Sequence, residues 1–543
     1  MDSIPPPKSV HWTSGLAKLF STSKSRAERT SFRVATVGYR PDLSPLLGGT
    51  PSPRIAPPSA QAPLSTSSSS SAAPATPLPP VSSGASGLAA YVREGSVRGS
   101  IFNLCSATLG AGALSLPYAF SRGGLFSSLL LLLVAAAATT LSITLLIRTA
   151  ERTGLGSYEL ITVHLFGAWT GAVVELCIIV FCFGTCVAYI VAVGDILDAG
   201  VIQVVDGLPG WLDREKMMIF FFIAVMFPLS LFEKINSLRF SSLFGIMSIF
   251  FLVFTTAYHS IDALATNGFD DSWGLADVTM WPTSFSNFIQ ATPIVMFAFT
   301  CQVNVFSIYE ELENASPRRM SRVSVGAVKT CVAAYLLMGV FGYLDFGATT
   351  NSNILLNYCV SKTHNPLMIS SFVCIVITIV MAFPLNIFPC RFTLEVILHR
   401  WLSRSKKKEG EDDVEKRLLD PAAGPSDSAP DQDHATRLPP SRTRHFLLTL
   451  LISGLSLITA LKVQHISQVF QLMGGTASAF VCFVLPAAFA IKLNLYKDKL
   501  GLKIATWALA IGGAVIGTLS TVVTIYNMIY PEPETTLDCD GIK

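Results

Sequence analysis

Charged residues are scarce in this chain. Of its 543 residues only 14% are Asp, Glu, Lys or Arg, and 51% are hydrophobic, whereas about 25% of an ordinary soluble domain is charged. Long uncharged stretches must form helices in a bilayer, because there every backbone N–H and C=O has to be paired within the chain. The composition therefore predicts an all-α polytopic membrane protein, surrounded by lipid, with no nucleic-acid partner.

Motifs of enzymes and metal sites are also missing. The sequence contains no HExxH, no Walker motif, no nucleophile elbow, no CxxC pair and no histidines at zinc spacing. We therefore expect no enzymatic activity, no cofactor and no metal. Most of the eleven cysteines lie in apolar segments and are expected to act as small apolar core residues. Cys359 and Cys539 fall in loops on one side of the membrane, where a bridge between them is an open alternative.

Apolar stretches of at least about 17 residues identify eleven candidate membrane spans. They cover residues 98–121, 124–148, 170–204, 216–232, 238–261, 285–309, 323–346, 366–395, 444–461, 465–491 and 502–530. Lys and Arg gather in alternate loops, as the positive-inside rule requires. The N-terminus is therefore predicted to be cytoplasmic, and the C-terminus extracellular or lumenal.

The regions outside the spans differ in composition. Residues 1–95 are rich in Pro, Ser and Ala and are expected to form a disordered cytoplasmic tail, because they cannot bury enough apolar surface to fold. Residues 96–530 form the predicted transmembrane domain, in which the charged segment 400–443 is expected to be a mobile cytoplasmic loop. Residues 531–543 are expected to form an extracellular or lumenal tail.

Two of the predicted spans contain residues that weaken helices. The first reads CSATLGAGALSLPYAF and places Gly110, Gly112 and Pro117 near mid-membrane. The sixth carries Pro293 and then the polar run TCQVN. The two spans lie five apart and so cross the membrane in opposite directions. This arrangement predicts a 5+5 inverted repeat with broken first and sixth helices, plus one extra helix.

A broken helix exposes amide N–H groups on one half and carbonyl groups on the other. The N–H groups and the helix dipole favour a carboxylate, and the carbonyls favour an ammonium group, so two matched breaks predict a site for a zwitterion. Small residues also serve as packing surfaces in membrane helices, and proline as a simple kink. This alternative stays open for each break taken alone.

Three segments carry a resemblance to a known family. They are FNLCSATLGAGALSLPYAF followed by GG, FAFTCQVNVFSIYEEL, and FPLNIFPCR. Together they resemble the amino acid/auxin permease family, and the GAGALSLP form looks most like its kinetoplastid-protozoan members. The resemblance covers about residues 95–530, apart from the 400–443 loop. It implies eleven spans, a fold similar to that of the bacterial leucine transporter, and secondary active transport of amino acids coupled to protons or sodium ions.

The resemblance also implies roles for particular residues. The turn that meets the substrate carboxylate would be formed by Thr108, Leu109, Gly110, Ala111 and Gly112. The amine would be met by carbonyls and a hydroxyl from Phe297, Ala298, Phe299 and Thr300, with Gln302 close by. Asn103 resembles a position that helps to hold the coupling-ion region, although an interhelical hydrogen bond is an equally good interpretation.

The coupling ion is predicted from the eighth span. Sodium-coupled relatives are expected to carry Ser or Thr within about a turn of the proline that is Pro384 here, but this chain has Val380 and Ala382, with Thr378 further away. This favours protons over sodium. Intramembrane carboxylates are candidates for carrying a proton, and Asp195 is the first choice.

The substrate and the membrane are less constrained. No acidic cluster lies at mid-membrane, so neutral amino acids are expected, and a cationic amino acid stays open. The alternatives are a sodium-coupled symporter and an amino acid sensor with little transport. The C-terminus has no retention signal, so the plasma membrane is the default location, with a vacuolar or lysosome-type membrane as the alternative.

Overall fold

The computed structural model describes residues 95–202, 213–231, 238–267, 277–360, 365–418, 442–463, 465–497 and 499–530. The chain divides into two units, Met1–Arg93 and Glu94–Lys543, and all described residues belong to the second. Every regular element among them is a helix. The tails predicted at 1–95 and 531–543 lie outside the described residues, apart from Gly95.

The described helices match the predicted membrane spans. Nine helices are long and apolar enough to cross a membrane, and a bent pair supplies a tenth span. The intact ones are α5 (Leu125–Thr153), α7 (Ala168–Leu197), α10 (Leu238–Asn267), α13 (Pro317–Phe346), α15 (Pro366–Leu418), α16 (Arg442–Ala460) and α19 (Leu500–Ile529). The span predicted at residues 465–491 consists of α17 (Ile466–Met473), η10 (Gly474–Val484) and α18 (Leu485–Lys492). The predicted fourth span is the shorter series α8 (Arg214–Phe221), η5 (Phe222–Met226) and α9 (Phe227–Ser230). The prediction of an all-helical polytopic membrane protein is confirmed.

The first span is broken where the sequence predicts it. Helix α3 (Val97–Thr108) ends at Leu109, and Gly110 is extended, with φ −147° and ψ −157°. The chain resumes as η3 (Ala111–Ser115) and α4 (Leu116–Gly123), bent by 54° from α3. Pro117 stands in the first turn of α4, where a missing N–H costs no hydrogen bond.

The sixth span is broken as well. Helix α11 (Phe285–Ala298) contains Pro293 and ends before the non-helical residues 299–301. The chain continues as η7 (Gln302–Asn304) and α12 (Val305–Glu311). The polar run that interrupts the apolar pattern in the sequence therefore coincides with the interruption of the helix.

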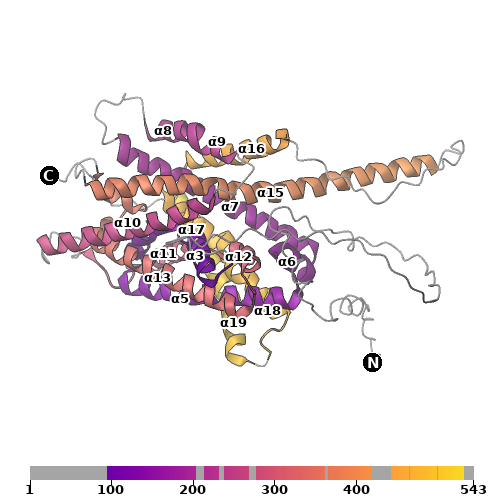
Figure 1. The fold of residues 1–543 in the computed structure, drawn as a ribbon, viewed down its shortest axis with the longest axis horizontal. Coiled ribbons are helices and arrows are strands. Elements are labelled where there is room, and N and C mark those ends of the chain that lie inside the picture. The colour runs from indigo at the N-terminus through magenta and orange to yellow at the C-terminus, as the bar shows by residue number, and fades with distance from the viewer. Residues whose placement is uncertain are drawn as a thin grey trace, which may run out of the picture. The chain divides into compact units, whose positions relative to one another are not determined.

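The two broken spans lie together in the bundle. Helix α11 packs against α4 and η3, and α13 packs against both α3 and α4. Figure 1 shows α3, α11 and α12 gathered near the middle of the bundle. Helix α17 packs against α11, η3 and α7, so a further span adjoins both broken ones.

Helix α15 corrects one boundary. The prediction ends the eighth span at residue 395 and begins a mobile loop at 400, but α15 continues to Leu418, as the long orange helix in Figure 1 shows. The segment SKKKEGEDDVEKRL is rich in Lys and Glu, which are good helix formers and alternate at spacings that allow i,i+4 pairs. A charged composition alone did not distinguish a loop from a solvated helix. Residues 419–441 lie outside the described part.

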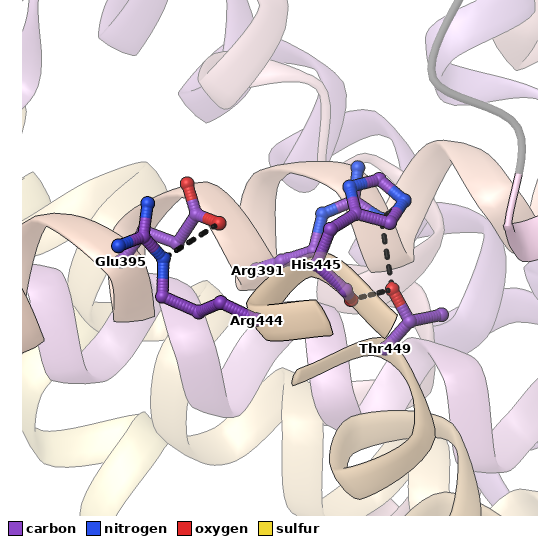
Figure 2. A network of polar contacts seen from close by, with 5 residues as sticks. All are labelled: Arg391, Glu395, Arg444, His445 and Thr449. Carbon is purple, nitrogen blue, oxygen red and sulfur yellow. Dashed lines mark hydrogen bonds and ion pairs between the residues drawn. The ribbon is translucent and has the colours of Figure 1, made fainter. Parts of the chain in front are cut away.

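A polar network joins α15 to α16 near their predicted cytoplasmic ends (Figure 2). The buried Arg391 donates to Thr449 Oγ1 at 2.9 Å and lies 3.2 Å from His445 Nε2. Beside it, Arg444 Nε lies 3.8 Å from Glu395 Oε1. Because several groups from both helices share these contacts, we expect the two helices to move as one body at this end.

Candidate functional site

A buried tyrosine of α13 joins the two helix breaks. The hydroxyl oxygen of Tyr335 lies 2.7 Å from the carbonyl oxygen of Thr108, at the first break, and 2.7 Å from that of Ala298, at the second. Its ring is fully buried and packs edge to face on Phe299, with centroids 5.3 Å apart. The breaks therefore meet at a single hydrogen-bonding group from a third helix.

The two breaks also touch directly at Gly112. A Cβ atom at this position would lie 3.2 Å from the Cα of Ala298 and 3.5 Å from Cδ1 of Phe297. Such a contact is tighter than ordinary van der Waals packing, so a side chain at this position would require the backbone of Ala298 to shift, whereas glycine lets the two backbones approach this closely. Of the residues predicted for the site, Thr108, Gly112, Phe297 and Ala298 are thus brought together.

Gly110 stands in different surroundings. Its extended backbone suits any residue, and an added Cβ would meet only the hydroxyl oxygen of Tyr189, at 3.9 Å. Neither conformation nor packing requires glycine here. Glycine at position 110 would be required if a ligand approached the backbone closely, because any side chain there would stand between the ligand and the amides.

The amide groups at the first break divide into two sets. The N–H of Leu109 donates to the Cys105 carbonyl at 2.7 Å, and the N–H of Ala113 donates to the Gly110 carbonyl at 3.1 Å. Between them, the amides of Gly110, Ala111 and Gly112 open a new helix, where the first N–H groups have no intrahelical acceptor. The predicted role of Leu109 is therefore confined to its place in the turn, since its own N–H is already engaged.

Aromatic rings cover the second break. Phe297 stacks on Phe470 of α17 with ring centroids 4.6 Å apart, and its centroid lies 6.1 Å from that of Phe181 on α7. All three side chains are buried. The break in the sixth span therefore meets an apolar wall contributed by three different helices.

Thr300 and Gln302 make mainly local contacts. The Thr300 N–H donates to the Phe297 carbonyl at 2.9 Å, and its hydroxyl donates to the Met296 carbonyl at 3.2 Å. Gln302 is fully buried and accepts the Cys301 N–H at 2.9 Å, while its Nε2 has no hydrogen-bond acceptor among the described residues. Gln302 thus satisfies a backbone N–H within the break and leaves one buried donor for another group.

The three residues predicted for ion coupling lie apart from these contacts. Asn103 is exposed on α3. Thr378 donates to the Cys374 carbonyl and would touch a Cβ on Gly245, so it faces α10. Asp195 is buried on α7. The structure does not gather them into one cluster, and their role stays a prediction.

Two buried carboxylates near the predicted outer ends of the helices have contrasting partners. Asp195 Oδ1 accepts from Arg214 Nη2 at 2.6 Å and Nε at 3.0 Å. Asp345 Oδ2 lies 3.3 Å from both His259 Nδ1 and the Tyr358 hydroxyl. The partner of Asp195 is a guanidinium group, which is a permanent cation, whereas the partners of Asp345 are an imidazole ring and a phenol hydroxyl.

Cys359 follows this second cluster directly and is disulfide-bonded. The other described cysteines, nine in number, are free. Cys539, the partner that the sequence offers, lies outside the described residues. Disulfides persist in oxidising compartments, which agrees with the predicted extracellular or lumenal side for this loop.

A cavity of about 210 Å³ opens between α6 (Tyr158–Phe166), α7, α12 and α15. Its lining comprises Gly156, Ser157, Tyr158, Glu159, Ile178, Val303, Phe306, Ser307, Pro389, Phe392 and Thr393. Burial raises the pKa of the Glu159 carboxyl above its ordinary value. The cavity lies on the side of the breaks toward the predicted cytoplasmic loops, since α12 is the cytoplasmic half of the sixth span.

Sequence reasoning missed the residues that surround the predicted ones. Tyr335, Tyr189 and Phe470 lie on unbroken helices that carry no motif. A signal was present for the tyrosines, because a hydroxyl at mid-membrane needs a hydrogen-bonding partner. No pattern in the sequence told which partner that would be.

Comparisons with known proteins agree with this architecture. A sequence model of the family described as "Transmembrane amino acid transporter protein" matches residues 93–530. The chain is 27% identical over 435 residues to "Vacuolar amino acid transporter 5" of Schizosaccharomyces pombe, covering 78% of this chain and 92% of the relative. It is 25% identical over 450 residues to "Sodium-coupled neutral amino acid transporter 7" of Danio rerio, covering 80% and 87%.

The fold has solved counterparts as well. A crystal structure of a mutant manganese transporter of Eremococcus coleocola is similar with a TM-score of 0.51 and 12% identity, covering 82% of this chain and 88% of that one. At this identity the likeness shows the fold alone. The finer resemblance to kinetoplastid-protozoan sequences stays a prediction.

Proposed function

Because the chain belongs to the family of transmembrane amino acid transporter proteins, we propose that it carries neutral amino acids into the cytoplasm by proton symport, with alternating access to its site. The protein is an amino acid transporter and not an enzyme. The substrate class, the coupling ion and the membrane are the proposed parts.

In this proposal the substrate-binding site lies between the two breaks. The carboxylate lies on the amides of Gly110, Ala111 and Gly112, at the start of a helix, where N–H groups and the dipole favour an anion. The ammonium group lies on the carbonyls of Thr108 and Ala298. The observation that carries the proposal is the meeting of those two carbonyls at one hydroxyl, 2.7 Å from each.

The residues that line this binding site suit a substrate with a neutral side chain. Phe297, Phe470 and Phe181 form a buried aromatic cluster at the second break, which favours an apolar substrate side chain. A cationic side chain would need a carboxylate beside it, and the described contacts of the two breaks include none. Neutral amino acids are therefore the proposed substrates, with cationic ones as the weaker alternative.

The proposed coupling ion is a proton. Val380 and Ala382 provide no hydroxyl on the eighth span, and Thr378 faces α10. Asp195 and Asn103 keep their proposed roles near the ion path. Sodium coupling is the second candidate, and the observation in its favour is the similarity to the Danio rerio relative, which is named a sodium-coupled transporter.

The proposed location is a vacuolar or lysosome-type membrane. Relatives from two yeasts are named vacuolar amino acid transporters. The plasma membrane was expected only because the C-terminus has no retention signal, and these relatives do not support it. Import into the cytoplasm then means that the amino acid leaves an acidic lumen together with protons, which move down their own gradient.

Uptake into proteoliposomes tests the proposal. Labelled neutral and cationic amino acids are offered under an imposed proton gradient and, separately, under a sodium gradient. We expect accumulation of neutral amino acids with protons alone. Accumulation with sodium alone would replace the proton by sodium, and binding without uptake under either gradient would make the protein a sensor.

A further inference from the structure

We infer that the Tyr335 hydroxyl takes the place of the substrate ammonium when the carrier returns without substrate. The inference rests on the proposed function, because it assumes that the carbonyls of Thr108 and Ala298 receive the amine. It adds a role for a residue on an unbroken helix, which belongs to neither break.

The geometry assigns this role to the hydroxyl alone. Both carbonyl oxygens lie 2.7 Å from it, but a phenol carries only one hydrogen. At any moment Tyr335 can therefore donate to one carbonyl and leaves the other without that donor. An ammonium group has three hydrogens and can satisfy both carbonyls from the same region.

The surroundings hold the hydroxyl at this point. Tyr335 is fully buried, and its ring rests edge to face on Phe299. Helix α13 packs along both α3 and α4, so the ring is anchored to the two helices that flank the first break. A buried carbonyl without a donor keeps the full cost of its desolvation, and water is scarce at mid-membrane.

The consequence concerns the transport cycle. A loaded carrier satisfies the break carbonyls with the substrate amine. A carrier that returns without substrate must satisfy at least one of them by other means, and Tyr335 supplies that donor. Removing the hydroxyl therefore slows the return of the substrate-free carrier more than it slows the movement of the loaded one.

Net uptake and exchange separate these two movements. Net uptake into amino-acid-free vesicles requires the substrate-free return, whereas exchange in vesicles preloaded with unlabelled amino acid does not. The variant Tyr335→Phe removes the hydroxyl and keeps the ring. The matched control is Tyr343→Phe on the same helix, which removes a buried hydroxyl that accepts the Thr279 N–H at 2.9 Å, away from the breaks.

For Tyr335→Phe we expect net uptake under a proton gradient to fall about tenfold, the equivalent of one unsatisfied carbonyl. Exchange should stay close to that of the unmodified protein, because the bound amine supplies the missing donor. Tyr343→Phe should keep the ratio of net uptake to exchange unchanged. Equal losses of both activities in Tyr335→Phe, or unchanged net uptake, would overturn the inference.

A second variant supplies an amine in place of the phenol. Tyr335→Lys places near the carbonyls an amine that carries three hydrogens when it is protonated, and we expect it to abolish both net uptake and exchange while the purified protein remains monodisperse. Normal exchange by Tyr335→Lys would also overturn the inference. If the unmodified protein shows neither uptake nor exchange, the proposed function itself is wrong, and that result is distinct because it needs no variant.

Discussion

The two helix breaks lie in contact with each other but differ in the residues that form them. At the first, Gly110, Ala111 and Gly112 carry almost no side chain, and an extended residue separates two helices bent by 54°. At the second, the residues are Phe297, Ala298 and Phe299, with rings that pack on neighbouring helices.

This difference assigns separate tasks to the two breaks. The first presents backbone with almost no side chains, and under the proposed function its amides hold the substrate carboxylate. The second combines backbone carbonyls with aromatic walls and so adds a surface for the substrate side chain. In this account the first break recognises what all amino acids share, and the second discriminates among them.

The strongest disruption of this division should come from Gly112→Val. Its Cβ would lie 3.2 Å from the Cα of Ala298, and the two extra methyl groups would force the breaks apart. We expect uptake to fall by about a hundredfold or more, as for a misplacement of about 1 Å in a reaction centre, measured in proteoliposomes with protein of verified monodispersity.

The control for this variant is Gly454→Val on α16, where an added Cβ meets nothing within 4 Å. It should transport at close to the unmodified rate. Normal uptake by Gly112→Val would mean that the close contact of the breaks is dispensable, and the comparison above would lose its basis.

A smaller and more selective effect is expected for Phe297→Ala. The change removes the ring that stacks on Phe470 at 4.6 Å and with it part of the apolar wall. The KM for large neutral amino acids should rise about tenfold, while that for alanine or glycine changes less. Uptake kinetics with a series of substrates measures this directly.

Phe254→Ala provides the matched control, since this phenylalanine is 61% exposed on α10 and lies outside both breaks. An equal rise in KM for small and large substrates in Phe297→Ala would contradict a discriminating role for the second break.

The mildest prediction concerns Gly110→Ala. The added methyl would lie 3.9 Å from the Tyr189 hydroxyl oxygen, an ordinary contact on a backbone that alanine adopts easily. The melting temperature should stay unchanged, yet the methyl would crowd the carboxylate and weaken apparent affinity by about fivefold, or roughly 1 kcal/mol. Unchanged affinity for every substrate would show that no ligand approaches this glycine.

The sequence predicted both breaks closely, for a physical reason. Gly110, Gly112 and the polar run after Phe299 conflict with an apolar helix, and mid-membrane leaves few ways to resolve that conflict except interruption. Local composition was therefore sufficient for the breaks and for the spans on either side of them.

Contacts between distant segments could not be predicted in the same way. Tyr335 contacts Thr108, which lies 227 residues earlier in the sequence. Arg214 likewise contacts Asp195, which lies on another helix. Such pairs depend on how the helices pack, which a pattern within one span does not encode. The length of α15 was missed for another reason. The charged composition after residue 400 is compatible both with a loop and with a solvated helix.

Competition by blocked substrates tests the central claim most directly. If the amides of the first break hold a carboxylate and the carbonyls of the two breaks hold an ammonium group, both charges are required. Uptake of a labelled neutral amino acid should be inhibited by the free amino acid, but neither by its methyl ester nor by its N-acetyl derivative at the same concentration. Equal inhibition by either blocked form would show that the breaks do not hold that end of the substrate.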